Sequence, residues 1–160
     1  MKLDTQLLAD VSAFLNIEAD MLDNKEYQQW LDLWIESGLY IVPVEHNATD
    51  YANTLNVAYD DHEMRLLRIE RLTSGNAIST QLSEKTVRTM SRFRILDDVD
   101  GVVRVRCAYC LYENNKNGLR CYPANLQFKL VRDGGSFKIA EKVVKIMKSS
   151  QHLTTVSYLF

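Results

Sequence analysis

A CxxC motif is the first group of residues in this sequence with side chains that could carry chemistry. Cys107 and Cys110 have the spacing that many redox and zinc sites use. The motif falls in a run of strand-forming residues, however, and residues three apart in a strand point to opposite faces of the sheet. Cys121 could join a zinc site only across a hairpin, and the neighbouring strands contain no histidine. The sequence therefore favours ordinary strand cysteines over a redox or zinc site.

Histidine and carboxylate side chains come together at one point, Asp60-Asp61-His62. A histidine beside a carboxylate can act as a general base in a small dehydratase or isomerase, with Tyr59 or Tyr27 as the proton donor. That chemistry requires Asp60, His62 and Tyr59 to converge in a cavity. The alternative is that one aspartate caps a helix and His62 lies solvated in its first turn. We favour the cap, because an aspartate at a helix start needs no catalytic explanation.

Arginines gather on two consecutive expected strands. Arg88, Arg92 and Arg94 share one face of the first strand if its side chains alternate regularly, and Arg104 and Arg106 follow on the second strand. They could form cross-strand ion pairs on a solvated face. They could equally form a contact surface for a partner, because arginine suits bidentate contacts across interfaces. The residue pattern leaves both alternatives open.

The last residues form an apolar, aromatic segment that includes Tyr158, Leu159 and Phe160. Such a segment would fray in water unless it docks on its own domain or on another chain. These three residues therefore join the arginines as candidates for a subunit interface.

Composition narrows the class of protein. The 160 residues are 46% hydrophobic and 25% charged, which is typical of one globular domain with its own core. A net charge of −2 disfavours a nucleic-acid-binding protein, since such proteins normally carry a basic excess. The longest uncharged apolar stretch, 39–44, is too short to span a membrane, and no signal peptide is recognisable. Together with an odd number of cysteines, these features predict a cytoplasmic protein.

The elements that position these residues fall into two groups, of which the first is helical. Apolar residues recur every three or four positions at 7–22 and again at 26–35, which predicts two amphipathic helices, the second ending near Gly38. A short edge strand follows at 39–44. A third helix is expected after Asp60, where Glu63 has capping-box spacing, and should end at Gly75.

The second half of the chain changes to the two-residue period of strands. Runs at 87–96, 102–113, 119–132 and 136–148 are separated by glycine-containing turns, which predicts an antiparallel meander. Strands this long rarely stay flat, so we expect bulges and strong coiling, with a bulge or kink at Pro123. Helices followed by such a sheet indicate an α+β domain, a cone with an interior pocket. We expect one domain over 1–160, with a helical part at 1–75, a curved sheet at 86–148 and a C-terminal tail at 152–160.

Short segments spread over nearly the whole chain carry a family resemblance. They are FLNIEA at 14–19, LD at 22–23, YQQWLDL at 27–33, YIVP at 40–43, YDDHEMRLLRIERL at 59–72, the strand at 137–144 and the tail at 156–160. In order and spacing these segments resemble the small (beta) subunit of bacterial aromatic-ring-hydroxylating dioxygenases. The segment VRTMSRFRI, around Arg88 to Arg94, departs from the histidine- and asparagine-bearing strand that is usual in that family.

The resemblance implies a fold and a role. The fold is the cystatin-like cone shared with scytalone dehydratase and nuclear transport factor 2. The implied role is that of a non-catalytic subunit without a cofactor, which supports assembly of the large (alpha) oxygenase subunit. The large subunit would carry a Rieske [2Fe-2S] cluster and a mononuclear Fe(II). Three large and three small chains would form a hexamer that adds both atoms of dioxygen to an aromatic ring during aromatic catabolism, with electrons derived from NADH.

The residue inventory agrees with that role. A Rieske site needs two cysteines and two histidines in paired motifs, and a mononuclear iron needs two histidines and a carboxylate. The histidines His46, His62 and His152 are scattered, and the sequence contains neither set. We therefore expect no catalytic residue and no metal or cofactor site in this chain. A free-standing cone-fold dehydratase or isomerase is the alternative.

Overall fold

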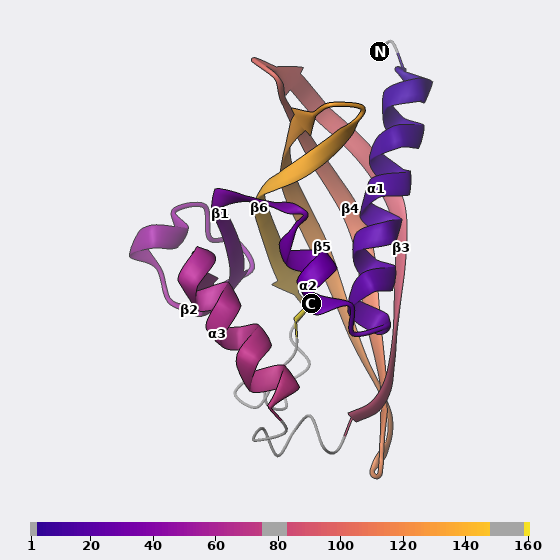
Figure 1. Cartoon of the computed structure of the whole chain (residues 1–160), viewed down its shortest axis with the longest axis vertical. Helices are drawn as coiled ribbons and strands as arrows, with labels where there is room; N and C mark the ends of the chain where they lie inside the picture. Colours follow the sequence, from indigo (N-terminus) through magenta and orange to yellow (C-terminus); the bar gives the residue numbers. More distant parts are fainter. Residues whose placement is uncertain (1–2, 75–82, 148–158) are drawn as a thin grey trace.

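In the computed structural model, which describes residues 3–74, 83–147 and 159–160, a curved sheet wraps around three α-helices on its concave side (Figure 1). No helix within these ranges has the length and hydropathy of a membrane span. The elements in chain order are α1 (Thr5–Asp23), α2 (Tyr27–Leu31), β1 (Trp34–Pro43), the 3₁₀ helix η1 (Tyr51–Asn53), β2 (Asn56–Asp60), α3 (His62–Thr73), β3 (Ser83–Val99), β4 (Val102–Asn115), β5 (Gly118–Asp133) and β6 (Ser136–Ile146).

The sheet has the strand order β2-β1-β6-β5-β4-β3. The predicted meander of four long antiparallel strands is confirmed as β3 to β6, and Gly101 and Gly118 have the positive φ angles of 78° and 107° that its tight turns require. The part expected to be mainly helical, 1–75, also contributes two strands to the same sheet: β1, which overlaps the strand expected at 39–44, and β2, which was not expected. β1 pairs parallel to β6, with Ile41 opposite Val143.

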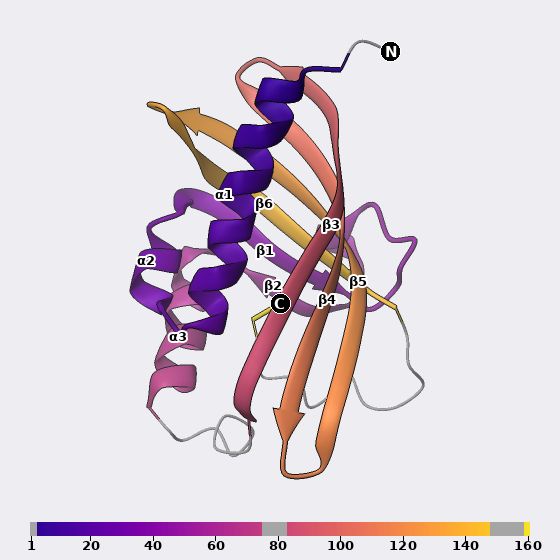
Figure 2. The same ribbon diagram turned by 90° about the vertical axis from the view of Figure 1, so that its right-hand side faces the viewer.

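Helix α1 follows the apolar period that its sequence predicts. The Asp4 carboxylate accepts a hydrogen bond of 2.9 Å from the backbone N–H of Leu7 and so caps the helix. One stripe of α1 is buried against the sheet (Figure 2). It consists of Leu7, Val11, Phe14, Leu15, Glu18, Ala19 and Leu22.

The second predicted helix, 26–35, is wrong in its second half. Helix α2 ends at Leu31, and the chain enters β1 at Trp34, five residues before the predicted strand. The reason is tertiary: the Ile139 N–H donates to the Leu33 carbonyl (2.7 Å), which starts the pairing with β6. The rings of Trp30 and Trp34 then meet edge to face, 5.2 Å between centroids, in the core. Packing against the sheet therefore overrides helical spacing here.

The expected bulges occur in β3, with a further register shift between Lys129 and Leu130 of β5, rather than at Pro123. Pairing between β4 and β5 runs without a shift through Cys110 opposite Pro123. Proline is tolerated there because the pairing of β5 with β6 ends at Ala124, and the Pro123 carbonyl accepts the N–H of Met147 (2.9 Å). The register of β3 shifts instead near Ser83, near Asp97 and between Ser91 and Arg94.

The bulge between Ser91 and Arg94 reverses which residues of β3 face the core. Before it, the even-numbered Arg88 and Met90 point inward, and after it the odd-numbered Phe93 and Ile95 do. Arg92 sits in the bulge with a positive φ of 56°. An extra residue in one strand has this effect, because each strand residue alternates in face. Arg88 and Arg94 therefore point to opposite faces, although regular alternation predicted one face for both.

Candidate functional site

The proposed catalytic group Asp60, His62 and Tyr59 does not converge. The Asp60 side chain is buried and accepts two hydrogen bonds from Arg68, one of 3.0 Å from Nη2. Tyr59 faces the other side of β2 and is 40% exposed, and His62 is exposed in the first turn of α3. The helix cap is Asp61, which accepts the Met64 N–H at 2.9 Å. Asp60 is therefore one partner of a structural ion pair, and the geometry contradicts a shared acid–base site.

The cysteines lie as strand periodicity predicted, on opposite faces. Cys107 is fully buried on the inner face, and Cys110 is half-buried on the outer face. Burial raises the pKa of the Cys107 thiol to about 12, so the thiol stays protonated at neutral pH. Within the residues that the structure describes, no three His, Cys, Asp or Glu side chains are grouped as they would be around a metal ion.

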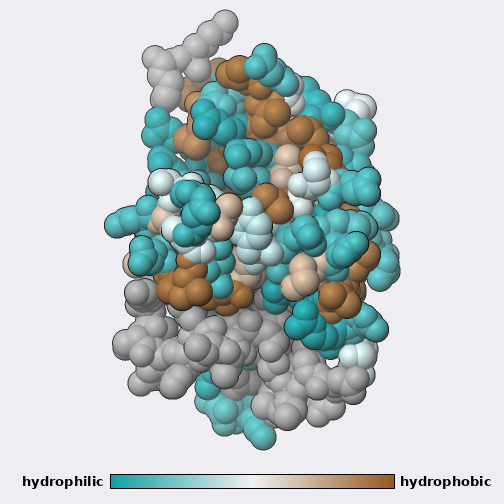
Figure 3. Space-filling model, turned by 90° about the vertical axis from the view of Figure 1, so that its left-hand side faces the viewer, coloured by the Kyte–Doolittle hydropathy of each residue, from teal (hydrophilic) through white to brown (hydrophobic). Residues whose placement is uncertain are grey.

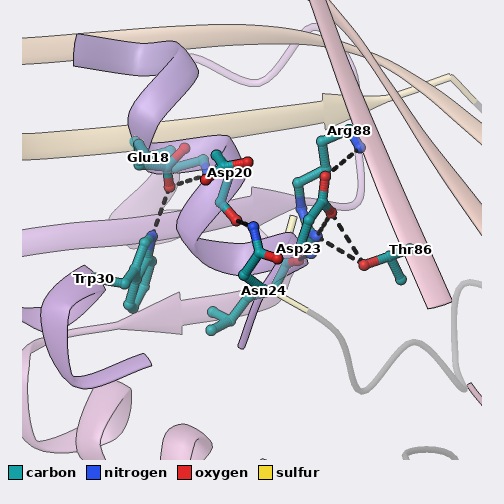
Figure 4. A network of polar contacts seen from close by, with 9 residues as sticks. Glu18, Asp20, Asp23, Asn24, Trp30, Thr86 and Arg88 are labelled. Atoms are coloured by element: carbon teal, nitrogen blue, oxygen red, sulfur yellow. Dashed lines mark hydrogen bonds and ion pairs between the residues drawn. The ribbon is translucent and has the colours of Figure 1, made fainter. Parts of the chain in front are cut away.

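A buried ion pair joins α1 to β6. Glu18 and Lys142 are 1% and 0% exposed, and Lys142 Nζ lies 2.7 Å from Glu18 Oε1. The indole Nε1 of Trp30 donates to the same oxygen at 2.6 Å, which Figure 4 shows from close by. Burial lowers the pKa of Lys142, and the adjacent Glu18 carboxylate opposes that shift. The carboxylate thus holds two donors from separate elements.

A second interior network is centred on Asp23, at the end of α1 (Figure 4). Its carboxylate accepts hydrogen bonds from the Thr86 hydroxyl (3.0 Å) and the Arg88 backbone N–H (2.8 Å), and forms an ion pair with the Arg88 guanidinium. The Arg88 side chain is only 4% exposed. The expectation that Arg88 contributes to a surface for a partner is therefore wrong for this chain: the residue fastens β3 to α1.

The last two described residues are held by Arg88 and by Tyr40. Arg88 Nη2 donates to the Leu159 carbonyl, and the Tyr40 hydroxyl accepts the Phe160 N–H at 3.0 Å. The Phe160 ring packs edge to face on Tyr122, with 5.8 Å between centroids. Leu159 and Phe160 are each 2% exposed. Of the two alternatives for this segment, docking on its own domain is the one observed at these residues, while Tyr158 lies outside the described ranges.

Four of the five predicted arginines are carried by β3 and β4 with their side chains outside the core. Arg104 is bound to Asp97, one contact being 2.8 Å, and Arg92 Nη2 donates to Asn125 Oδ1 at 2.7 Å. Arg94 lies directly opposite Arg106 in the β3–β4 register. We call Arg92, Arg94 and Arg106 the outer arginine cluster.

The charges that sequence reasoning missed are the interior ones. Glu18 interrupts the apolar stripe of α1, and Lys142 occupies an inward position of β6. A charged residue at an apolar position is the signal that could have identified each of them, because such residues are almost never fully buried unless paired.

The surface of the molecule is mainly polar where Figure 3 shows it. On that face hydrophilic residues predominate, and apolar residues form separate, smaller groups.

These features define an α+β cone in which three ion pairs, Glu18–Lys142, Asp23–Arg88 and Asp60–Arg68, join helices to the sheet. The family model described as "Ring hydroxylating beta subunit" matches residues 17–151, and this chain belongs to that family. The beta subunit of biphenyl 2,3-dioxygenase from Rhodococcus jostii is 23% identical over 98% of this chain and 90% of that protein. The anthranilate 1,2-dioxygenase small subunit from Acinetobacter baylyi is 25% identical over 81% and 82% of the two chains.

Solved structures agree on the fold. A chain of naphthalene 1,2-dioxygenase, solved with indole in the active site, superimposes with a TM-score of 0.81 at 19% identity, covering 99% of this chain and 88% of that one. The benzoate 1,2-dioxygenase beta subunit from Burkholderia mallei gives 0.78 at 19% identity, covering 99% of each. A scytalone dehydratase-like protein from Novosphingobium aromaticivorans gives 0.70 at 12%, covering 95% and 92%. The expected cone fold is confirmed.

Proposed function

We propose that this chain is the non-catalytic small subunit of a ring-hydroxylating dioxygenase. Its partner is a large oxygenase subunit that carries the Rieske [2Fe-2S] cluster and the mononuclear Fe(II), and the complex oxidises an aromatic compound with dioxygen. Three copies of each chain assemble as a hexamer in the cytoplasm. Family membership over residues 17–151, and relatives that are themselves named as dioxygenase subunits, support this assignment.

The observation that carries the proposal is how the charged groups inside the cone are used. Lys142 and Glu18 are paired with each other, Arg88 with Asp23, and Asp60 with Arg68. A general acid or base must present its side chain to a substrate within hydrogen-bonding reach. Here each of these groups joins two elements of the fold instead. This use of the interior charges favours a structural role, in which the chain presents surfaces to other subunits.

Co-expression with the large subunit of the same oxygenase tests the proposal. We expect the two chains to co-purify in equal numbers, with a native mass that fits three of each. Iron and acid-labile sulfide should be present in the complex and in the large subunit, and not in the small chain purified alone. Two chains that elute separately under all conditions would contradict the proposed function.

A matched variant separates the proposal from the dehydratase or isomerase alternative. His62→Ala removes the exposed histidine on which that alternative depends, while leaving the Asp61 cap in place. We expect the assembled oxygenase to convert its aromatic substrate at an unchanged rate. A large loss of turnover in His62→Ala, with assembly intact, would favour chemistry on this chain.

A further inference from the structure

We propose that the outer arginine cluster is the docking surface for an acidic patch of the large oxygenase subunit. This inference rests on the proposed function. The first observation is that Arg94 and Arg106, two like charges, lie directly opposite each other on β3 and β4. Like charges directly opposite each other in a sheet destabilise it, whereas opposite charges at such a position stabilise it.

The surroundings of the cluster do not neutralise it. Gln127 lies opposite Arg106 on β5, and the cluster also borders Ala108 and Asn125, all uncharged. The carboxylates farther along the strands are already used within the described residues. They form the pairs Asp97 with Arg104, Asp98 with Arg132, and Glu141 with Lys129. Arg94 and Arg106 have no carboxylate partner among the residues that the structure describes.

The backbone holds this arrangement in place. Without the bulge between Ser91 and Arg94, regular alternation would put Arg94 on the inner face together with Arg88. The bulge carries a residue with positive φ, Arg92, in a conformation that costs a non-glycine residue free energy. The same Arg92 then spans β4 to reach Asn125 on β5. The result is three guanidinium groups on adjacent strands of one rigid sheet.

Carboxylates are the partner chemistry that such a group fits. Guanidinium groups bind carboxylates with paired hydrogen bonds, and charge complementarity mainly sets association rate and specificity. A two-fold contact with a second copy of this chain would bring two identical cationic clusters face to face, which is repulsive. The proposed function supplies a chain of different sequence, the large subunit, to carry the acidic surface.

The test compares the double variant Arg94→Gln/Arg106→Gln with a matched control, Arg104→Gln. The control removes an arginine from the same strand and outer face that already has its own partner, Asp97. Binding of the purified large subunit to each immobilised small-chain variant is measured at low and at high salt. We expect the double variant to bind at least tenfold more weakly at low salt, and the control to bind within about twofold of the unmodified chain.

The thermal midpoint of the isolated chain is the second readout. Removal of a like-charge pair should leave the midpoint of the double variant unchanged or raise it, so weaker binding would not reflect a damaged fold. Salt should weaken binding of the unmodified chain more steeply than that of the double variant. Equal binding by the double variant and the unmodified chain would overturn the docking surface while leaving the proposed function intact.

Protection of the sheet edge is a competing role for the cluster, and the same test distinguishes it. β3 is an edge strand of the sheet, and charged residues and bulges on edge strands prevent edge-to-edge association. If the double variant self-associates but binds the large subunit normally, the cluster protects the edge and the proposal is wrong. If the unmodified chain fails to bind the large subunit at all, the proposed function itself fails.

Discussion

Burial shifts the pKa values of several interior side chains so that their neutral forms are favoured. It raises the pKa of Tyr40 to about 12, against a small opposing effect of the hydrogen bond from Phe160, and raises the pKa of Tyr109 as well. The Cys107 pKa rises to about 12 and the Lys142 pKa falls, in both cases because charged forms lose solvation in the core. The three raised pKa values make the stability of the chain fall as the pH rises into the alkaline range, whereas the lowered Lys142 pKa acts in the opposite direction.

Cys107→Ala isolates one of these shifts. The thiol pKa is raised from its ordinary 9.0 to about 12 in the folded chain, so its contribution to stability is complete below pH 9 and is lost as the pH rises toward about 12. The free energy of unfolding of the unmodified chain should fall relative to that of Cys107→Ala by about 1.4 kcal/mol per pH unit in that window. Urea titrations from pH 7 to 11 measure this difference.

The control for this prediction is Cys121→Ala, which changes an exposed thiol. It removes a thiol of the same kind from the surface, and the pH dependence of Cys107→Ala is read against it. A difference between Cys107→Ala and the unmodified chain that stays constant from pH 7 to 11 would contradict a buried, protonated thiol. The contribution of Tyr40 is common to all three chains and cancels in the comparison.

At the scale of elements, β1 depends on a close approach at Gly38. A Cβ atom there would lie 2.9 Å from the carbonyl oxygen of Ile139 and 3.0 Å from ring atom Cε3 of Trp34. The Gly38 carbonyl also accepts a hydrogen bond from the buried Arg65, whose guanidinium lies over the Trp34 ring at 4.4 Å. The glycine that was expected to end a helix instead lets the strand pack against β6 and α3.

Gly38→Ala should therefore destabilise the chain by about 1 to 3 kcal/mol, because backbone and a packed ring must move to admit the methyl group. Gly135→Ala is the matched control: a Cβ there meets nothing within 4 Å, and we expect a change within about 0.5 kcal/mol. Chemical denaturation of both variants measures the two changes. Equal stabilities of the two variants would contradict the close approach.

The sequence predicted those elements well that depend on residue spacing and turn residues within a short stretch of chain. The apolar stripe of α1 and the glycine turns of the meander follow from spacing and turn chemistry alone. The start of β1 at Trp34 did not, since it depends on pairing with Ile139, about a hundred residues later. Strand β2 was not predicted either, although its partner β1 lies just across one loop. The arginines of the candidate site were found by residue type, but their faces were not. The bulge at Arg92 determines which face each arginine is on, and no glycine or proline beside it in the sequence indicates a change of register.

At the scale of the whole molecule, charged contacts join the helices to the sheet at separate points. Glu18 with Lys142 connects α1 to β6, and Asp23 with Arg88 connects α1 to β3. Arg68 connects α3 to Asp60 at the end of β2. The hydrophobic core supplies most of the driving force for this arrangement, while the buried pairs fix how the layers are aligned.

Lys142→Met tests the tie between α1 and β6. Among the residues that the structure describes, it leaves the buried Glu18 carboxylate with the Trp30 indole as its one remaining donor, so we expect a loss of about 3 to 5 kcal/mol in unfolding free energy. The double variant Glu18→Gln/Lys142→Met removes both charges and keeps an oxygen acceptor for Trp30. It should be more stable than Lys142→Met alone, as measured by urea unfolding. A double variant that loses the sum of both single effects would show that the two charges do not interact.

The parallel pairing of β1 with β6 has a consequence for how the chain is synthesised. β6 lies between β1 and β5, so the last of the described strands to leave the ribosome occupies the interior of the sheet. β1 can pair with β6 only after Ile139, about a hundred residues after Trp34, has been synthesised. Until then β1 has no neighbour along that edge, and its backbone donors and acceptors there stay unpaired. The sheet is therefore completed only after β6 has left the ribosome.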